Sequence, residues 1–240
     1  MRSGSNHYAS DGQPVADLEH LFEELLDAAL DEADQVKDRG RIAGSVGPLR
    51  ASYRPDLHPD LETATTLYTE IVQRLAPRVD VILFETAPSI TAAKAALAAG
   101  RTADKPVWLA LTVNDSDGSK LRSGEPVAEA AKIVAAADAI LINCSMPEAI
   151  PAALTAAAQA GKPIGAYANG FTKLEEAFVT GGTTVAALSA RQELTPEVYA
   201  RHVLDWVAHG ATIVGGCCEV GPAHIREMAR QLIAAGHTIT

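Results

Sequence analysis

Short apolar runs rich in β-branched residues alternate with longer alanine-rich segments from about residue 41 onward. The short runs are typical of strands, and the alanine-rich segments repeat their apolar positions with a helical period. Six strands are predicted, at Arg41–Val46, Asp80–Phe84, Pro106–Val113, Ala139–Asn143, Pro163–Ala168 and Ala211–Val214. The helices between them are predicted near Leu61–Leu75, Thr91–Ala99, Val127–Ala137, Pro147–Ala160, Pro196–His209 and Pro222–Ala234.

This alternation predicts βα units on a parallel sheet. We expect a single domain over residues 1–240, in which residues 1–40 form an N-terminal segment and a helix, Asp17–Lys37, ahead of the first strand. A βα series closes as a barrel or stays open as a doubly wound sheet, and no Gly-x-Gly-x-x-Gly follows the first strand to favour a dinucleotide-binding fold. We therefore predict an α/β fold of the TIM-type (β/α)8 barrel, incomplete with about six βα units.

Composition and charge narrow the range of partners. The formal net charge is -10 and no cluster of Lys and Arg breaks the acidic pattern, so nucleic acid and anionic membranes are poor partners. The first residues contain no apolar targeting segment, and no apolar run is long enough to span a bilayer. The three cysteines are too few for a disulfide framework. We expect a cytoplasmic protein with reduced thiols.

Polar residues and glycines gather where the predicted strands end. They are Gly47 and Pro48, Glu85 and Thr86, Asn143 and Cys144, Asn169 and Gly170, and Gly215 to Cys218. In a parallel barrel the carboxyl ends of the strands meet on one face, and that face holds the active site. All three cysteines belong to this set, which predicts that they converge.

Three converging cysteines suit a zinc ion (Zn²⁺) held by Cys144, Cys217 and Cys218. Adjacent residues of a regular strand point to opposite faces, so Cys217 and Cys218 reach one ion only if the chain already turns after Val214. Gly215 and Gly216 permit such a turn. Three protein ligands with a vacant position are typical of catalytic zinc, and thiolate ligands favour sulfur nucleophiles, since zinc deprotonates a bound thiol that then accepts a methyl group.

Other interpretations of the cysteines stay open at this stage. A buried cysteine is often only a small apolar residue, which applies first to Cys144. The adjacent pair Cys217 and Cys218 could be redox-active, and the two glycines before it could cradle a phosphate. Glu85 follows a buried apolar run, which places its carboxylate to meet a ligand amine, although an exposed loop carboxylate is the simpler alternative.

The motifs Gly44-Ser45-Val46-Gly47-Pro48, Phe84-Glu85-Thr86, Asn143-Cys144 and Gly215-Gly216-Cys217-Cys218, in this order, resemble the homocysteine S-methyltransferase family. The resemblance covers roughly residues 5 to 236 and implies zinc-dependent methyl transfer to homocysteine, giving methionine. It implies that Cys144, Cys217 and Cys218 bind zinc, that Glu85 contacts the homocysteine amine and that Asn143 acts beside the first ligand. Tyr8 matches a segment in which some members place a tyrosine near the zinc, and Asn169, Gly215 and Gly216 are further predicted substrate contacts.

Two departures from the family bear on activity. The family's first two strands, with an Asp-Gly-rich loop that touches homocysteine, have no counterpart in this sequence. The motif Tyr167-Ala168-Asn169-Gly170 also differs from the Tyr-Pro-Asn of many S-methylmethionine users, so the donor stays open among S-methylmethionine, S-adenosylmethionine and betaine. The alternative function is a zinc- or thiol-binding protein without turnover. Because two unpaired strand edges would need cover, we expect a homo-oligomer.

Overall fold

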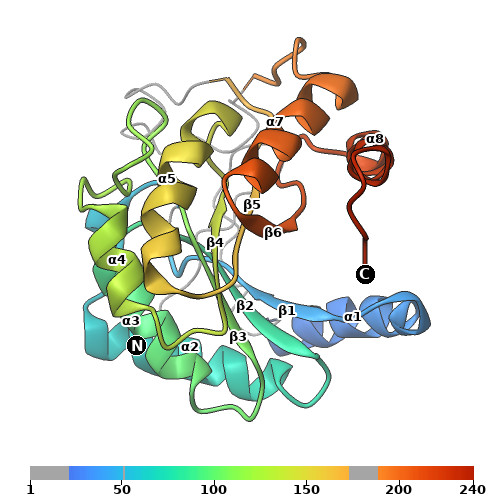
Figure 1. Ribbon diagram of the computed structural model, residues 1–240. Helices are drawn as coiled ribbons and strands as arrows, with labels where there is room; N and C mark the ends of the chain where they lie inside the picture. The colour runs from blue at the N-terminus through green and yellow to red at the C-terminus, as the bar shows by residue number, and fades with distance from the viewer. Residues whose placement is uncertain (1–21, 51, 173–188) are drawn as a thin grey trace.

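The computed structural model describes residues 22–50, 52–172 and 189–240. Its centre is a sheet of six parallel strands whose spatial order follows the chain, from β1 to β6 (Figure 1). The strands are β1 (Ala43–Val46), β2 (Val81–Ala87), β3 (Val107–Leu111), β4 (Ala139–Asn143), β5 (Ile164–Tyr167) and β6 (Ala211–Val214). The predicted α/β fold is confirmed, since each strand pairs in parallel with the one before it.

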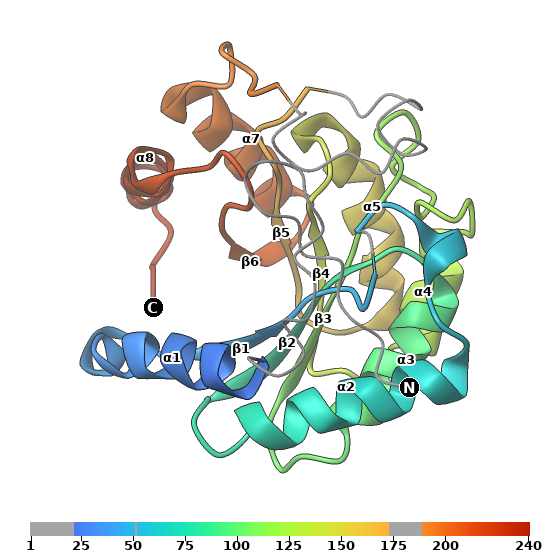
Figure 2. The same cartoon turned by 180° about the vertical axis from the view of Figure 1, so that it is seen from behind.

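Helices connect the strands and cover the outer face of the curved sheet, as Figures 1 and 2 show from opposite sides. The α-helices are α1 (Phe22–Asp34), α2 (Leu61–Leu75), α3 (Ile90–Gly100), α4 (Val127–Ile133), α5 (Ile150–Ala157), α7 (Pro196–Ala208) and α8 (Pro222–Ala234). Short 3-10 helices are η2 (Lys37–Arg39), η3 (Pro55–Leu57), η4 (Pro147–Ala149) and η5 (Ala158–Ala160). None of the helices in the described ranges has the length and apolar character needed to cross a membrane.

Within the described residues the sheet does not close, because β1 pairs only with β2 and β6 only with β5. Strand order and parallel pairing are those expected for six βα units of an incomplete TIM-type barrel. Helix α1 and the C-terminal helix α8 lie on the side where the sheet is open (Figures 1 and 2). The prediction of an incomplete barrel is therefore confirmed at the level of the fold.

Several predicted boundaries need correction. Strand β2 runs to Ala87, so Glu85 and Thr86 belong to the strand instead of following it. The helix predicted over Pro147–Ala160 is divided into η4, α5 and η5, since two prolines remove backbone donors near its start. The N-terminal helix predicted over Asp17–Lys37 ends at Asp34, and its predicted start lies outside the described residues.

The two faces of the sheet pack differently. The outer face and the helices form one large buried cluster, whereas the inner face carries a small one made of Ala110, Ala139, Leu141 and Tyr167. On β4 every residue is buried, but on the edge strand β1 the residues of the inner face, Ala43 and Ser45, are exposed. The inner face is thus closed at its centre and open toward the edge, which leaves it accessible from the side of β1.

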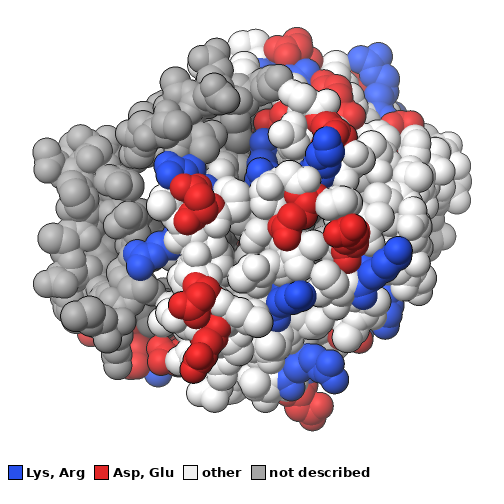
Figure 3. All heavy atoms as spheres, turned by 90° about the vertical axis from the view of Figure 1, so that its left-hand side faces the viewer, with Lys and Arg blue, Asp and Glu red and all other residues white. Residues whose placement is uncertain are grey.

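Charged side chains are interspersed on the surface. On the face shown in Figure 3, acidic and basic groups alternate, and the described part of that face carries no continuous basic field. The described part of this face therefore presents no concentrated positive field.

Candidate metal and substrate site

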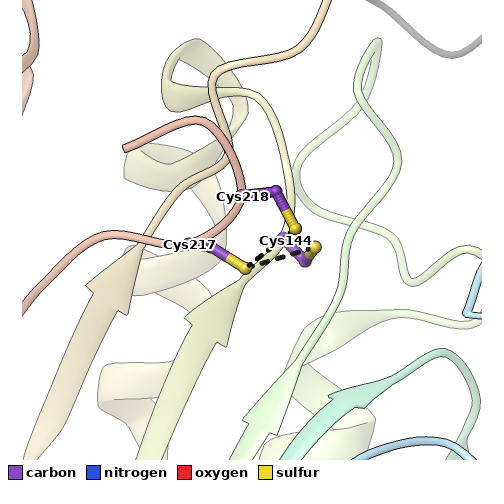
Figure 4. A group of neighbouring side chains, drawn as sticks. All are labelled: Cys144, Cys217 and Cys218. Atoms are coloured by element: carbon purple, nitrogen blue, oxygen red, sulfur yellow. Dashed lines mark hydrogen bonds between the residues drawn. The ribbon is translucent and has the colours of Figure 1, made fainter. Parts of the chain in front are cut away.

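The three cysteines meet above the carboxyl end of the sheet. Cys144 directly follows β4, and Cys217 and Cys218 lie in the loop after β6 (Figure 4). The Cys217 Sγ lies 3.4 Å from the Cys144 Sγ and 3.9 Å from the Cys218 Sγ. All three sulfur atoms lie within 4.8 Å of one another. The structure therefore brings together the residues that the sequence singled out from two distant segments.

Backbone hydrogen bonds fix these positions. The Cys144 N–H donates to the Tyr167 carbonyl at 3.2 Å, and the Cys217 N–H donates to the Ala168 carbonyl at 3.0 Å. Both cysteines are thereby anchored to the end of β5, which lies between their own strands. Cys144 has φ 49°, a left-handed conformation that is uncommon outside glycine and that turns the chain sharply at the end of β4.

The turn after β6 forms, but not through positive φ at the glycines. Neither Gly215 nor Gly216 has a positive φ, and the left-handed residue is Glu219, with φ 63°. Gly216 is required for a different reason, because a Cβ atom there would lie 2.2 Å from a methyl carbon of Val220. The chain thus depends on close packing at Gly216 to fold the two cysteines back toward Cys144.

The three thiols differ in their pKa values. Contact with the Cys144 and Cys217 thiols lowers the pKa of Cys218 to about 3 despite its burial. Contact with the other two thiols, together with burial, raises the pKa of Cys217. The Cys217 thiol lowers the pKa of Cys144, but the Cys218 thiol and burial outweigh this effect and raise the pKa of Cys144 to about 11. In the absence of a metal the cluster is expected to carry one thiolate, on Cys218, at neutral pH.

The sulfur geometry suits a tetrahedral metal. With Zn–S bonds of about 2.3 Å, two ligands of a tetrahedron lie about 3.8 Å apart, close to the separations of 3.4 and 3.9 Å found here. A disulfide would need sulfurs about 2.05 Å apart, and all three cysteines are free. Thiolates would also repel a phosphate. Among the alternatives that the sequence left open, a thiophilic metal fits this donor set best.

Glu85 lies on the inner face near the end of β2. Its carboxylate accepts a hydrogen bond from the Ser45 hydroxyl on β1. The pairing between β2 and β3 shifts register between Phe84 and Ala87, so Glu85 sits at an irregularity of the strand. An irregularity of this kind re-aims side chains relative to a regular sheet.

Tyr167, at the end of β5, brings an unsatisfied polar group to the same region. Its side chain is 9% exposed, and its hydroxyl has no hydrogen-bond partner in the described structure. Burial raises the pKa of Tyr167, and the nearby Glu85 carboxylate raises it further through its charge and a hydrogen-bonding contact, as do the charges of the Cys217 and Cys144 sulfurs. The hydroxyl therefore stays protonated. The hydroxyl lies near the Glu85 carboxylate but makes no hydrogen bond of standard geometry in the described structure. A ligand bound at this point would meet both groups.

Asn143 lies fully inside the fold, where it supports the turn that follows Glu85. Its side-chain oxygen accepts from the Thr86 N–H and its amide donates to the Thr86 hydroxyl, each at 2.9 Å. Thr86 is left-handed, with φ 59°, which is a genuine outlier for a β-branched residue. Asn143 is 1% exposed. The structure thus gives it a positioning contact, and direct action on a substrate remains a prediction.

The structure gives the remaining predicted substrate contacts that it describes roles in the backbone of the site. The Asn169 side-chain oxygen accepts from the Phe171 N–H at 3.2 Å, so it stabilises the loop after β5. A Cβ atom added at Gly215 would lie 3.5 Å from the Cβ of Tyr167, and Gly216 allows the close packing of the cysteine loop described above. Tyr8 lies outside the described residues.

Other residues near the cysteines were not recognised in the sequence. The Tyr53 hydroxyl lies 3.0 Å from the Cys144 Sγ, and burial is the main cause that raises its pKa. Arg122 stacks on the Tyr53 ring and pairs with Asp115. The Tyr199 hydroxyl donates to the Gly215 carbonyl at 2.7 Å and so ties α7 to the end of β6. The loops that follow β1 and β3 contain Tyr53, Asp115 and Arg122. Loops after strands form the active-site face of a parallel barrel, so this position in the sequence could have identified the three residues as candidates.

Comparison with known proteins identifies the family. Residues 5–232 match the family described as Homocysteine S-methyltransferase. The chain belongs to the homocysteine S-methyltransferase family. The family resemblance seen in the sequence is thereby confirmed.

Individual relatives are distant and longer. Homocysteine S-methyltransferase 4 of Zea mays is 27% identical over 237 residues, which cover 88% of this chain and 65% of that protein. Homocysteine S-methyltransferase 3 of Arabidopsis thaliana is 32% identical over 71% of this chain and 49% of its own length. The chain thus spans about half to two thirds of these relatives.

A solved structure supports the fold. The crystal structure of the metallated form of the homocysteine methyltransferase MmuM from Escherichia coli matches with a TM-score of 0.63 and 24% identity. The match covers 88% of this chain and 68% of that one. This likeness supports the α/β fold of parallel βα units described above.

Proposed function

We propose that this chain transfers a methyl group to the thiol of homocysteine, giving methionine, with a zinc ion held by Cys144, Cys217 and Cys218. The observation that carries the proposal is the convergence of three sulfur atoms within 4.8 Å at the carboxyl end of a parallel sheet. Membership of the homocysteine S-methyltransferase family supports the substrate class. The names of the relatives, homocysteine S-methyltransferases from plants among them, point the same way.

The donor set suits thiol chemistry. Cys144, Cys217 and Cys218 would hold a zinc ion with one position left for the substrate thiol, which the metal would favour in its deprotonated form at neutral pH, the proton passing to solvent. The methyl group then passes to the substrate sulfur: an S–C bond forms, and the bond from the methyl carbon to the donor's sulfonium or ammonium atom breaks. The electron pair of the broken bond leaves with the donor. No general base is needed for the methyl transfer itself.

The residues of the chain bind and orient the amino acid. Glu85 provides a carboxylate for the homocysteine amine, and the Ser45 hydroxyl holds that carboxylate in place. The buried Tyr167 hydroxyl, unsatisfied within the described part of the chain, offers a further hydrogen bond to the same ligand. Asn143 fixes the turn at Thr86, and through it the end of β2 that carries Glu85.

The methyl donor and the compartment are parts of the same proposal. S-methylmethionine, S-adenosylmethionine and betaine each carry a methyl group on a positively charged atom, which an electron-rich thiolate attacks. Three free thiols function as ligands only where they stay reduced, so we place the reaction in the cytoplasm. Homocysteine and one of these donors would be its partners.

The test is methionine formation by zinc-loaded protein from homocysteine and each of the three donors, labelled with deuterium in the methyl group. Mass spectrometry should find the label in methionine with at least one donor. A chelator should abolish the reaction, added zinc should restore it, and Cys217→Ser should remain inactive. If zinc and homocysteine bind but no donor yields labelled methionine, the alternative of a zinc- or thiol-binding protein without turnover replaces the proposal.

A further inference from the structure

Cys144 differs from the other two cysteines in its surroundings. The Tyr53 hydroxyl lies 3.0 Å from the Cys144 Sγ. The hydrogen bonds that the structure records for the Cys217 and Cys218 sulfurs are with cysteine sulfurs. When Cys144 is a thiolate, the phenol is the donor and the sulfur the acceptor, since the thiolate has no proton.

Tyr53 is itself held by a cation. The guanidinium carbon of Arg122 lies 4.9 Å from the centre of the Tyr53 ring. Arg122 forms an ion pair with Asp115 at 2.8 Å, and the two side chains are only 10% and 4% exposed. Asp115 also accepts the Met146 N–H at 3.1 Å. These contacts leave little freedom in the ring and its hydroxyl.

Arg122 also reaches the backbone of the same cysteine. Its Nη2 donates to the Cys144 carbonyl at 3.4 Å, and the Thr112 hydroxyl donates to that carbonyl at 3.2 Å. The left-handed turn at Cys144 is therefore fixed on its carbonyl side, while Tyr53 contacts its sulfur. One buried positive charge thus supports both the backbone and the side chain of this residue.

A hydrogen bond to a metal-bound thiolate stabilises its electron pairs and makes it a weaker nucleophile. This matters in the proposed reaction, because the site would then hold four sulfurs, of which only the substrate's should accept the methyl group. Hydrogen-bond partners of metal ligands tune such sites, and their loss typically changes affinity or activity by about 10- to 100-fold.

We propose that the Tyr53 hydroxyl, positioned by Arg122 and Asp115, lowers the nucleophilicity of the Cys144 thiolate. This ligand is thereby protected from methylation while the substrate sulfur reacts. The inference rests on the proposed zinc site. It concerns the chain's own residues, and its effect should be measurable without turnover.

The experiment compares wild type with Tyr53→Phe, which removes only the hydroxyl, and with Tyr68→Phe, which does the same at a buried tyrosine of α2. Each zinc-loaded protein is treated with methyl iodide, whose methyl carbon bonds to a thiolate as iodide leaves. Peptide mass spectrometry then compares methylation of Cys144 with that of Cys217 and Cys218 in the same molecule. Tyr53→Phe should raise the relative rate at Cys144 about tenfold, which corresponds to about 1.4 kcal/mol.

Cobalt substitution gives a second readout. Losing the hydrogen bond makes the sulfur easier to oxidise, so the thiolate-to-cobalt charge-transfer band of Tyr53→Phe should move to lower energy, and that of Tyr68→Phe should not. An unchanged band together with unchanged Cys144 methylation would overturn the inference, even in an active enzyme. A shifted band and faster Cys144 methylation in a protein that makes no methionine would support the inference while refuting the proposed function.

Discussion

Asn143 and Thr86 exchange two hydrogen bonds of 2.9 Å across the intervening strand β3, so that an amide from β4 fixes a left-handed residue of β2. The contact lies within the fold, and Asn143 directly precedes Cys144. One side chain thereby couples the strand that bears Glu85 to the strand that directly precedes Cys144 of the candidate metal site. This relationship leads to the first prediction.

Asn143→Ala should lower the free energy of unfolding by about 1 to 3 kcal/mol, because it leaves the buried Thr86 N–H without its acceptor. Urea unfolding at equilibrium measures this. Asn114→Ala provides the control, since the Asn114 side chain only accepts N–H groups of an exposed turn, and its loss should cost clearly less. An equal cost for the two variants would contradict the assigned role of Asn143.

Zinc affinity should rise steeply with pH. The pKa of Cys144 is raised to about 11 and that of Cys217 is raised as well, whereas the pKa of Cys218 is lowered to about 3. At neutral pH zinc must therefore displace about two protons, from Cys144 and Cys217, and its apparent affinity should increase about a hundredfold per pH unit.

Competition with a chelator measures this slope over a range of about one pH unit on either side of neutrality. Zinc binding to Cys144→Ser should release one thiol proton instead of two. The apparent zinc affinity of this variant should therefore rise only about tenfold per pH unit. A pH-independent affinity of the wild-type protein would show that the protonation of the metal-free cluster is wrongly assigned.

Glu85→Gln should weaken homocysteine binding by roughly 1.5 to 3 kcal/mol, the value of a hydrogen bond between charged groups. A simple thiol without an amine should lose much less, because it never contacted the carboxylate. Calorimetry with both thiols measures the difference. Glu70→Gln, at an exposed position of α2, should change neither affinity, and equal losses for the two thiols in Glu85→Gln would assign Glu85 to structure instead of recognition.

The open sheet predicts self-association. Edge strands β1 and β6 each have a single partner among the described residues, and the inner face is exposed at β1. Such edges favour pairing with a second chain, so we expect a homodimer or larger assembly. Light scattering on zinc-loaded protein measures the mass. A stable, monodisperse monomer with a sharp unfolding transition would show that the open edge does not drive association.

The sequence predicted the strands well where composition marks their limits. The bounds of β4 and β6 agree with the structure at both ends, because an apolar run there gives way to polar residues or glycines. Prolines 196 and 222 also begin α7 and α8 as expected. The convergence of the three cysteines followed from a general property of parallel barrels, that the carboxyl ends of their strands share one face.

The parts that sequence could not predict depend on tertiary contacts. Thr86 and Cys144 adopt positive φ although neither is glycine, and for Thr86 the compensation comes from Asn143, which is distant in the chain. Tyr53 reaches the Cys144 sulfur across 91 positions of sequence. No local pattern marks such a tyrosine, because its role depends on where the loop after β1 meets the end of β4.

The sequential order of the strands also has a consequence for synthesis of the chain. Each strand from β2 onward pairs with the one made just before it, so the sheet can grow by local additions of low contact order while the chain is still emerging. The sulfur cluster cannot form in this way, since Cys144 must wait for two further βα units before Cys217 and Cys218 arrive. Binding of a metal at the proposed site would therefore come last and would distinguish a finished chain from a nascent one.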